Sequence, residues 1–145
     1  MRATEILLVD DNPADTDLTR EVLARSGYPS HIHAVADGVE AIAFLRREGK
    51  YANAPLTDFV ILDLSLPKKN GRTVLTEVKA DPVLRKIPIA IFSTSQAQCD
   101  IVRSYELGAN CYVSKPGNLQ AFVSAVTSIG EFWFGLARLP RLEER

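Results

Sequence analysis

Five short apolar segments, each followed by a longer amphipathic one, constrain the fold of this chain more than any other feature. They span residues 6–9, 31–35, 59–62, 87–92 and 111–113. The first, third and fourth are apolar almost without a break, which is typical of strands buried on both faces of a parallel sheet. Strands that alternate with helices predict an α/β fold, here a doubly wound five-stranded parallel sheet with helices on both faces. A chain of 145 residues is expected to form one such domain.

The segments between the apolar runs carry helix signals at their ends. Pro13 suits the first turn of a helix, where no amide donor is needed, and Asn118 can cap the last helix through its side-chain oxygen. Gly27 and Gly108 are expected to end the first and fourth helices.

The composition excludes several classes of protein. With 17 Lys and Arg against 18 Asp and Glu, the chain has no general reason to bind nucleic acid or an anionic membrane. No apolar run approaches the roughly 18 residues that a membrane-spanning helix needs, and residues 1–10 hold too short a run for a signal peptide. Cys99 and Cys111 make neither a disulfide framework nor a four-ligand metal site, so a reducing cytoplasm is the expected location.

Polar side chains gather where the expected strands end. Asp10 and Asp11 follow the first strand, Asp63 follows the third, Ser93 follows the fourth and Lys115 follows the fifth. Right-handed crossovers bring the carboxyl ends of parallel strands to one edge of the sheet. We therefore expect these side chains to surround a single crevice.

The chemistry of this crevice follows from its charges. Three carboxylates at ~4 Å and an effective dielectric of ~20 repel by about 4 kcal/mol a pair, so a divalent cation is the simplest compensation. Mg²⁺ suits one or two carboxylates plus waters and leaves room for phosphate oxygens. A carboxylate beside Mg²⁺ is also a nucleophile for phosphoryl groups, whose transfer needs mainly positioning and charge neutralisation. The residues predict an aspartyl-phosphate site with Asp63 as acceptor, and with Lys115 and the Ser93 hydroxyl at the phosphoryl oxygens.

Five short sequence motifs follow one another along the chain in a characteristic order. They read Leu-Leu-Val-Asp-Asp at 7–11, Leu-Asp-Leu-Ser-Leu-Pro-Lys-Lys-Asn-Gly at 62–71, Phe-Ser-Thr-Ser at 92–95, Gly-Ala-Asn at 108–110 and Lys-Pro at 115–116. Together they resemble the receiver domain of bacterial two-component response regulators. The resemblance implies a flavodoxin-like receiver domain over residues 4–130, with strand order 2-1-3-4-5. Residues 131–145 would be a C-terminal extension that continues the last helix and then forms a tail.

The resemblance also implies a metal and phosphate site. Asp63 would be the phosphoacceptor, and Lys115 would be the lysine that the family places beside the phosphoryl group. The expected Mg²⁺ ligands are all oxygens: the side chains of Asp10, Asp11 and Asp63 and the backbone carbonyl of Ser65.

A switch is implied at the ends of the fourth and fifth strands. Ser93 would be the hydroxyl that moves toward the phosphate, with Thr94 as a competing candidate. Tyr112 matches the aromatic switch position of the family, although an aromatic residue in a strand also fits ordinary packing. The bond between Lys115 and Pro116 would be a cis peptide, which X–Pro sequences make accessible.

A narrower resemblance concerns the loop at 49–57, the run at 67–71 and Glu-Phe-Trp-Phe at 131–134. These resemble the small response regulators paired with cyanobacterial phytochromes, which implies a phytochrome-type histidine kinase as partner, signalling through protein–protein contacts and a homodimer. Aromatic residues are enriched at interfaces. The expected dimer interface comprises Tyr112, Phe132, Trp133, Phe134 and Leu136. The alternative is that two of the tail aromatics pack on the core and one is exposed.

Other functions fit the sequence less well. A Mg²⁺-dependent aspartyl-phosphate hydrolase of the haloacid dehalogenase type would carry a second aspartate where Ser65 stands, and a phosphorylation-independent adaptor would not need the intact acidic set. The glycines never form G-x-G, so no dinucleotide fingerprint is present. His31 and His33 would share one face of a strand, where a metal pair is possible; no third ligand is evident, so surface histidines are the expectation.

Overall fold

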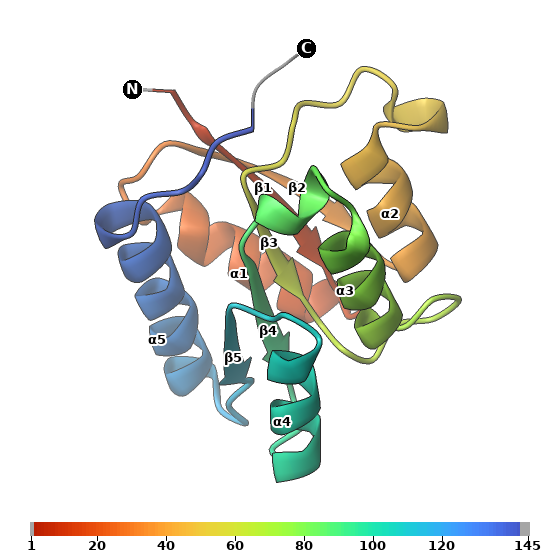
Figure 1. Ribbon diagram of the computed structural model, residues 1–145. Coiled ribbons are helices and arrows are strands. Elements are labelled where there is room, and N and C mark those ends of the chain that lie inside the picture. Colours follow the sequence, from red (N-terminus) through yellow and green to blue (C-terminus); the bar gives the residue numbers. More distant parts are fainter. Residues whose placement is uncertain (1, 143–145) are drawn as a thin grey trace.

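The computed structural model describes residues 2–142 and shows one five-stranded sheet between two layers of helices (Figure 1). The strands are β1 (Thr4–Val9), β2 (Ser30–Val35), β3 (Phe59–Leu62), β4 (Ile89–Ser93) and β5 (Cys111–Ser114). All neighbouring strands are parallel, in the order β2-β1-β3-β4-β5. The predicted fold class and strand order are confirmed.

Five α-helices cover the sheet. They are α1 (Pro13–Ala24), α2 (Gly38–Arg46), α3 (Gly71–Ala80), α4 (Gln98–Glu106) and α5 (Leu119–Gly130). Helices α1 and α5 lie on one face, and α2, α3 and α4 lie on the other (Figure 1). Over the described residues, no helix is both long and apolar enough to cross a lipid bilayer.

Short polar side chains start most of these helices. A side-chain oxygen accepts a hydrogen bond from the backbone N–H three residues later at Asn12, Asp37, Asn70 and Asn118. The predicted cap at Asn118 is confirmed. Asn12 therefore caps α1 in place of Asp10 or Asp11, and its own backbone N–H donates to Asp10 Oδ1 at 2.9 Å.

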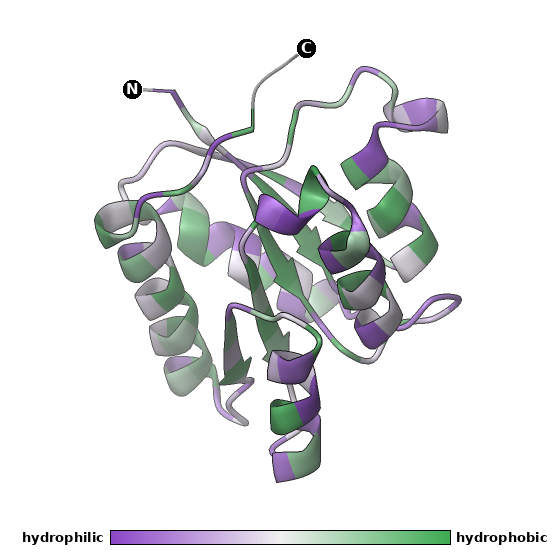
Figure 2. Ribbon diagram, viewed as in Figure 1, coloured by the Kyte–Doolittle hydropathy of each residue, from purple (hydrophilic) through white to green (hydrophobic). Residues whose placement is uncertain are grey.

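The apolar core forms two layers, one on each face of the sheet. Along β1, Ile6 and Leu8 face α1 and α5, whereas Leu7 and Val9 face α2 and α3. All four side chains are buried, which explains why the strand is apolar without alternation. Figure 2 shows the apolar strands at the centre and the mixed polarity of the surrounding helices.

The chain continues from α5 into a π-helical segment, Glu131–Leu136. Two of its aromatic side chains pack on the core, because the rings of Trp133 and Phe134 lie 5.1 and 5.4 Å from the ring of Phe59. Phe132 and Leu136 are 50% and 75% exposed. Trp133 and Phe134 are therefore half-buried against the core, whereas Phe132 and Leu136 are exposed.

Candidate functional site

The parallel ladder places two aspartates side by side at the carboxyl edge of the sheet. The backbone N–H of Asp63 donates to the carbonyl of Val9 at 2.9 Å, and that of Asp10 donates to the carbonyl of Val35 at 3.1 Å. Both residues directly follow their strands, so their carboxylates emerge at the same level of the sheet. Both are buried.

Lys115 joins these acids from the end of β5. Its ammonium lies 2.8 Å from Asp10 Oδ2, 2.9 Å from Asp63 Oδ2 and 2.9 Å from Asp15 Oδ2, and its side chain is 3% exposed. Burial alone would lower the pKa of Lys115, but the hydrogen bonds to Asp10, Asp63 and Asp15 raise it well above its usual value. The lysine therefore stays charged.

Asp15 is a member of this cluster that sequence reasoning missed. It lies in the first turn of α1, where its side chain reaches Lys115 from the helix side of the crevice. The sequence held no clear signal for it, because Asp15 lies inside α1 and does not directly follow a strand. A structural role in holding the lysine accounts for its position.

The acidic cluster carries more negative charge than Lys115 can balance. One oxygen from each of Asp10, Asp11 and Asp63 lies within 4.8 Å of the others, and Asp11 is exposed. Burial raises the pKa of Asp10, and the charge of Asp63 adds to this, against the hydrogen bonds from Lys115 and Asn12. Clustered carboxylate oxygens at this spacing are the ligands that a hard divalent cation prefers, so the donor set fits such an ion.

The loop after β3 shapes the far wall of the site. The backbone N–H of Ser65 donates to Asp63 Oδ1 at 3.3 Å, while Lys115 holds the other oxygen. A Cβ atom at Gly71 would lie 2.3 Å from the carbonyl oxygen of Asp63. Glycine is therefore required at that position for α3 to start so close to the site.

The residues expected to form a switch lie on β4 and β5. Ser93 is buried, whereas Thr94 is exposed. The Tyr112 hydroxyl donates to the carbonyl of Ser95 at 2.9 Å, so it is connected to the loop that follows β4.

The expectation of a cis peptide before Pro116 is wrong, because the described residues contain no cis peptide bond. The trans bond is the intrinsically preferred form. In this form the backbone N–H of Lys115 still donates to the carbonyl of Ser93 at 2.6 Å, which aligns the lysine with the acidic cluster.

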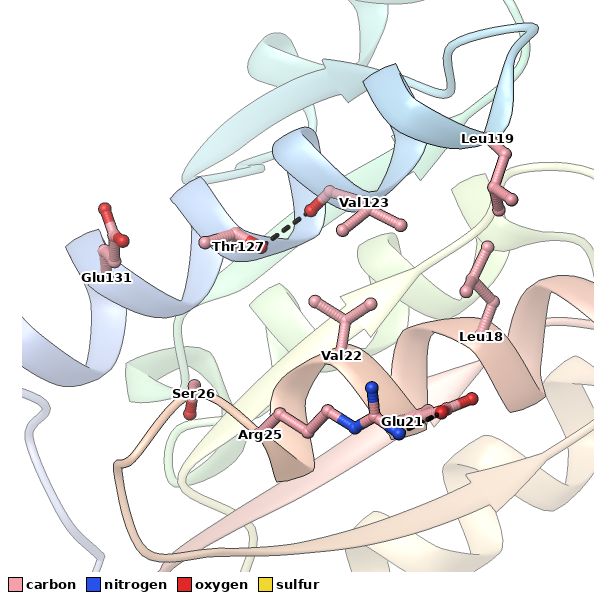
Figure 3. A pocket seen from close by; sticks show the side chains of 9 residues that line it. All are labelled: Leu18, Glu21, Val22, Arg25, Ser26, Leu119, Val123, Thr127 and Glu131. Atoms are coloured by element: carbon pink, nitrogen blue, oxygen red, sulfur yellow. Dashed lines mark hydrogen bonds and ion pairs between the residues drawn. The ribbon is translucent and has the colours of Figure 1, made fainter.

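Two surface cavities lie near α1. A small one of about 230 Å³ opens beside Asp10 and Asp11. A larger groove of about 450 Å³ runs between α1 and α5, where Leu18 points toward Leu119 and Val22 points toward Val123 (Figure 3). None of the acidic cluster lines the larger groove, whereas Asp10 and Asp11 line the smaller cavity.

Comparison with known proteins agrees with this geometry. The sequence matches the profile of the response regulator receiver domain over residues 6–127. The chain belongs to this family. It is 43% identical to response regulator Rcp1 of Synechocystis sp. over 135 residues, which cover 93% of this chain and 92% of the relative.

Solved structures of receiver domains extend the comparison. The phosphorylated cyanobacterial phytochrome response regulator RcpA is 48% identical, with a TM-score of 0.93 over 97% of this chain and all of that one. The Mn²⁺-bound form of Rcp1 is 42% identical, with a TM-score of 0.92 over 95% of this chain and 99% of that one. A magnesium-coordinated receiver domain of a Pseudomonas aeruginosa sensor histidine kinase is 27% identical, with a TM-score of 0.71 over 92% and 99%. This chain is therefore a response regulator receiver, related to the phytochrome response regulators.

Proposed function

We propose that Asp63 accepts a phosphoryl group from a histidine kinase and that Mg²⁺ assists the transfer. The observation that carries this proposal is the position of the Asp63 carboxylate, which contacts the Lys115 ammonium and has an oxygen within 4.8 Å of oxygens of Asp10 and Asp11. The two oxygens of Asp63 are held from different sides, one by the Lys115 ammonium and the other by the Ser65 N–H. Its carboxylate is therefore held in a fixed orientation beside the other acids.

The metal would be held by the side chains of Asp10, Asp11 and Asp63 and by the backbone carbonyl of Ser65. When bound, Mg²⁺ supplies charge neutralisation for the carboxylates and for the phosphoryl oxygens. The divalent metals in the related Rcp1 and Pseudomonas receiver structures support this assignment.

The chain's own residues account for the rest of the transfer. A carboxylate oxygen of Asp63 attacks phosphorus as the nitrogen–phosphorus bond of the phosphohistidine breaks, and the imidazole leaves with the bonding electrons. The Lys115 ammonium is already within hydrogen-bonding distance of Asp63, so it can move onto a phosphoryl oxygen. Later attack by water at phosphorus releases inorganic phosphate and restores the carboxylate, which makes the receiver a timer.

The signal would pass through Ser93 and Tyr112. The Ser93 hydroxyl would move toward the phosphoryl group and draw the loop after β4 with it. Tyr112 binds the Ser95 carbonyl of that loop, so the loop movement would change the surface formed by α4, β5 and α5.

Partners and assembly complete the proposal. The similarity to Rcp1 and RcpA supports a phytochrome-type histidine kinase as partner. The exposed side chains of Phe132 and Leu136 support a homodimer through this segment. We place the protein in the cytoplasm, with the receiver at residues 4–130 and the extension at 131–145.

Phosphotransfer tests the acceptor. Wild-type protein with Mg²⁺ and acetyl phosphate or a phosphorylated kinase is expected to gain one phosphate by intact mass. Asp63→Asn is expected to gain none, and Asp17→Asn, an exposed aspartate of α1, is the matched control. Equal labelling of the Asp63 variant would show that the acceptor is another residue.

Sedimentation tests the dimer. Phe132→Ser should weaken self-association without disturbing the core, whereas Val83→Ser, at a similarly exposed position, should not. An unchanged dimer in the Phe132 variant would exclude this surface.

A further inference from the structure

The amino edge of the sheet holds a cluster that the phosphorylation site does not use. Glu5 on β1 and His31 on β2 are partners in the parallel register, and His33 lies two residues further on the same face of β2. His31 Nδ1 lies 2.7 Å from Glu5 Oε2, and His33 Nε2 lies 2.8 Å from Glu5 Oε1. Glu5 is thus the third polar ligand that the sequence alone did not reveal.

These three side chains make a different donor set from the acidic cluster. Two imidazole nitrogens and one carboxylate suit borderline ions such as Zn²⁺, whereas carboxylates alone suit Mg²⁺. In a tetrahedral Zn²⁺ site with bonds of 2.0–2.2 Å, neighbouring ligand atoms lie roughly 3.3 Å apart. To admit the ion, each nitrogen–oxygen distance would open by about half an ångström. One ligand atom from each of the three residues does not now lie within 4.8 Å of the other two, so the imidazoles would also have to approach each other.

The surroundings allow this rearrangement. Each imidazole now contacts a different oxygen of Glu5, so an ion would draw both rings toward one side of the carboxylate. His31 is 65% exposed and free to turn, while His33 is held by stacking against Phe44 at 5.1 Å between ring centroids. One ligand is therefore preorganised, and the other can close over the ion from solvent, which leaves a position for water.

The nearby arginines bind another carboxylate and do not compete for Glu5. Arg2 and Arg141 bind the carboxylate of Asp58, which also accepts a hydrogen bond from the backbone N–H of Glu5. This bond fixes the backbone of Glu5, and its side chain remains with the two imidazoles.

We propose that Glu5, His31 and His33 form a second metal site, selective for Zn²⁺ or a similar transition-metal ion, at the end of the sheet opposite the acidic cluster. The two histidines are the only ones in the chain, so imidazole ligation can be observed without ambiguity.

The experiment is a titration of the untagged full chain with Zn²⁺ in excess Mg²⁺, followed by NMR of the histidine ring signals. Both rings are expected to shift together and to saturate at one equivalent of Zn²⁺. Glu5→Gln and His31→Asn are each expected to weaken binding by roughly tenfold or more. Glu21→Gln, an exposed glutamate of α1, is the matched control and should bind as the wild type does.

Each alternative outcome overturns the proposal. If the ring signals do not move while Zn²⁺ binds, the ion lies at the acidic cluster or at a cysteine. If Glu5→Gln binds as tightly as the wild type, the carboxylate is not a ligand. If Mg²⁺ shifts the rings equally, the site has no preference for a transition metal.

Discussion

The two edges of the sheet differ in how the charge of their buried carboxylates is balanced. At the amino edge, Asp58 has a fully buried side chain and accepts hydrogen bonds from Arg2, Arg141 and the backbone N–H of Glu5. At the carboxyl edge, Asp10 and Asp63 share the single ammonium of Lys115 with a third acid. A carboxylate whose charge is balanced stabilises the fold, whereas a cluster with excess negative charge favours binding of a cation or a reacting group.

The largest loss of stability is expected from removing Asp58, the carboxylate whose charge is balanced at the amino edge. Asp58→Ala removes three hydrogen bonds and should lower the free energy of unfolding by about 3 kcal/mol, because the partners and a buried space are left uncompensated. Urea unfolding measures this loss. Asp17→Ala is the control and is expected to change stability by less than about 0.5 kcal/mol.

A somewhat smaller loss of stability is expected from removing the Lys115 ammonium at the carboxyl edge. Lys115→Met should lower the free energy of unfolding by about 2 kcal/mol in EDTA, because the repelling carboxylates lose their shared partner. Added Mg²⁺ should restore much of the loss, and unfolding with and without the ion measures it. A loss that Mg²⁺ does not affect would contradict the idea of excess charge.

Neutralising Asp10, one of the acids at the same edge, should raise the free energy of unfolding, whereas removing Lys115 should lower it. Burial raises the pKa of Asp10, so its contribution to stability is fully present below the unfolded pKa near 3.9 and is lost as pH rises through the raised folded value. In EDTA at pH 7, Asp10→Asn should therefore raise the free energy of unfolding by about 1 kcal/mol. The difference should disappear near pH 3, and a variant that is less stable at pH 7 would show that the hydrogen bonds of Asp10 outweigh its burial.

The smallest change in stability is expected from removing one of the two arginines at the amino edge, and the two should differ. Arg141 binds both Asp58 and the Thr4 hydroxyl and is less exposed than Arg2. Arg141→Met should therefore cost about 1 kcal/mol and Arg2→Met about half of that, measured by thermal unfolding. Equal losses would show that neither the Thr4 contact nor the lower exposure of Arg141 strengthens its bond to Asp58.

The fold could be predicted because its signals are local and repeated. The apolar runs at 6–9 and 59–62 fit strands buried on both faces, and the caps and glycines mark the helix ends, as Asn118 and Gly108 do. The strand order depended on the resemblance to receivers, because apolar periodicity does not say which parallel strands are neighbours.

The site was predictable only where a residue directly follows a strand. Asp10, Asp63 and Lys115 satisfy this condition and lie together. Asp15 does not, because it joins the cluster from a helix turn. Glu5 is inside a strand, where its pairing with His31 depends on the register of β1 and β2 and not on any pattern in one segment.

The packing of the aromatic residues at 132–134 could not be predicted without the backbone conformation of this segment. Three consecutive aromatic residues cannot share one side of an ordinary helix, and the sequence did not say which would turn inward. The π-helical winding of Glu131–Leu136 brings Trp133 and Phe134 onto Phe59 and leaves Phe132 outside.

Asp58 also has a consequence for the connectivity of the chain. Because it binds Arg2 and Arg141 at once, the two ends of the described polypeptide meet at one carboxylate. A short peptide could join them, and new ends could be opened in the surface loop at 52–54, far from the phosphoacceptor. Such a circular permutant should keep the acidic crevice intact, since the crevice depends on which strands are neighbours and not on where the polypeptide starts.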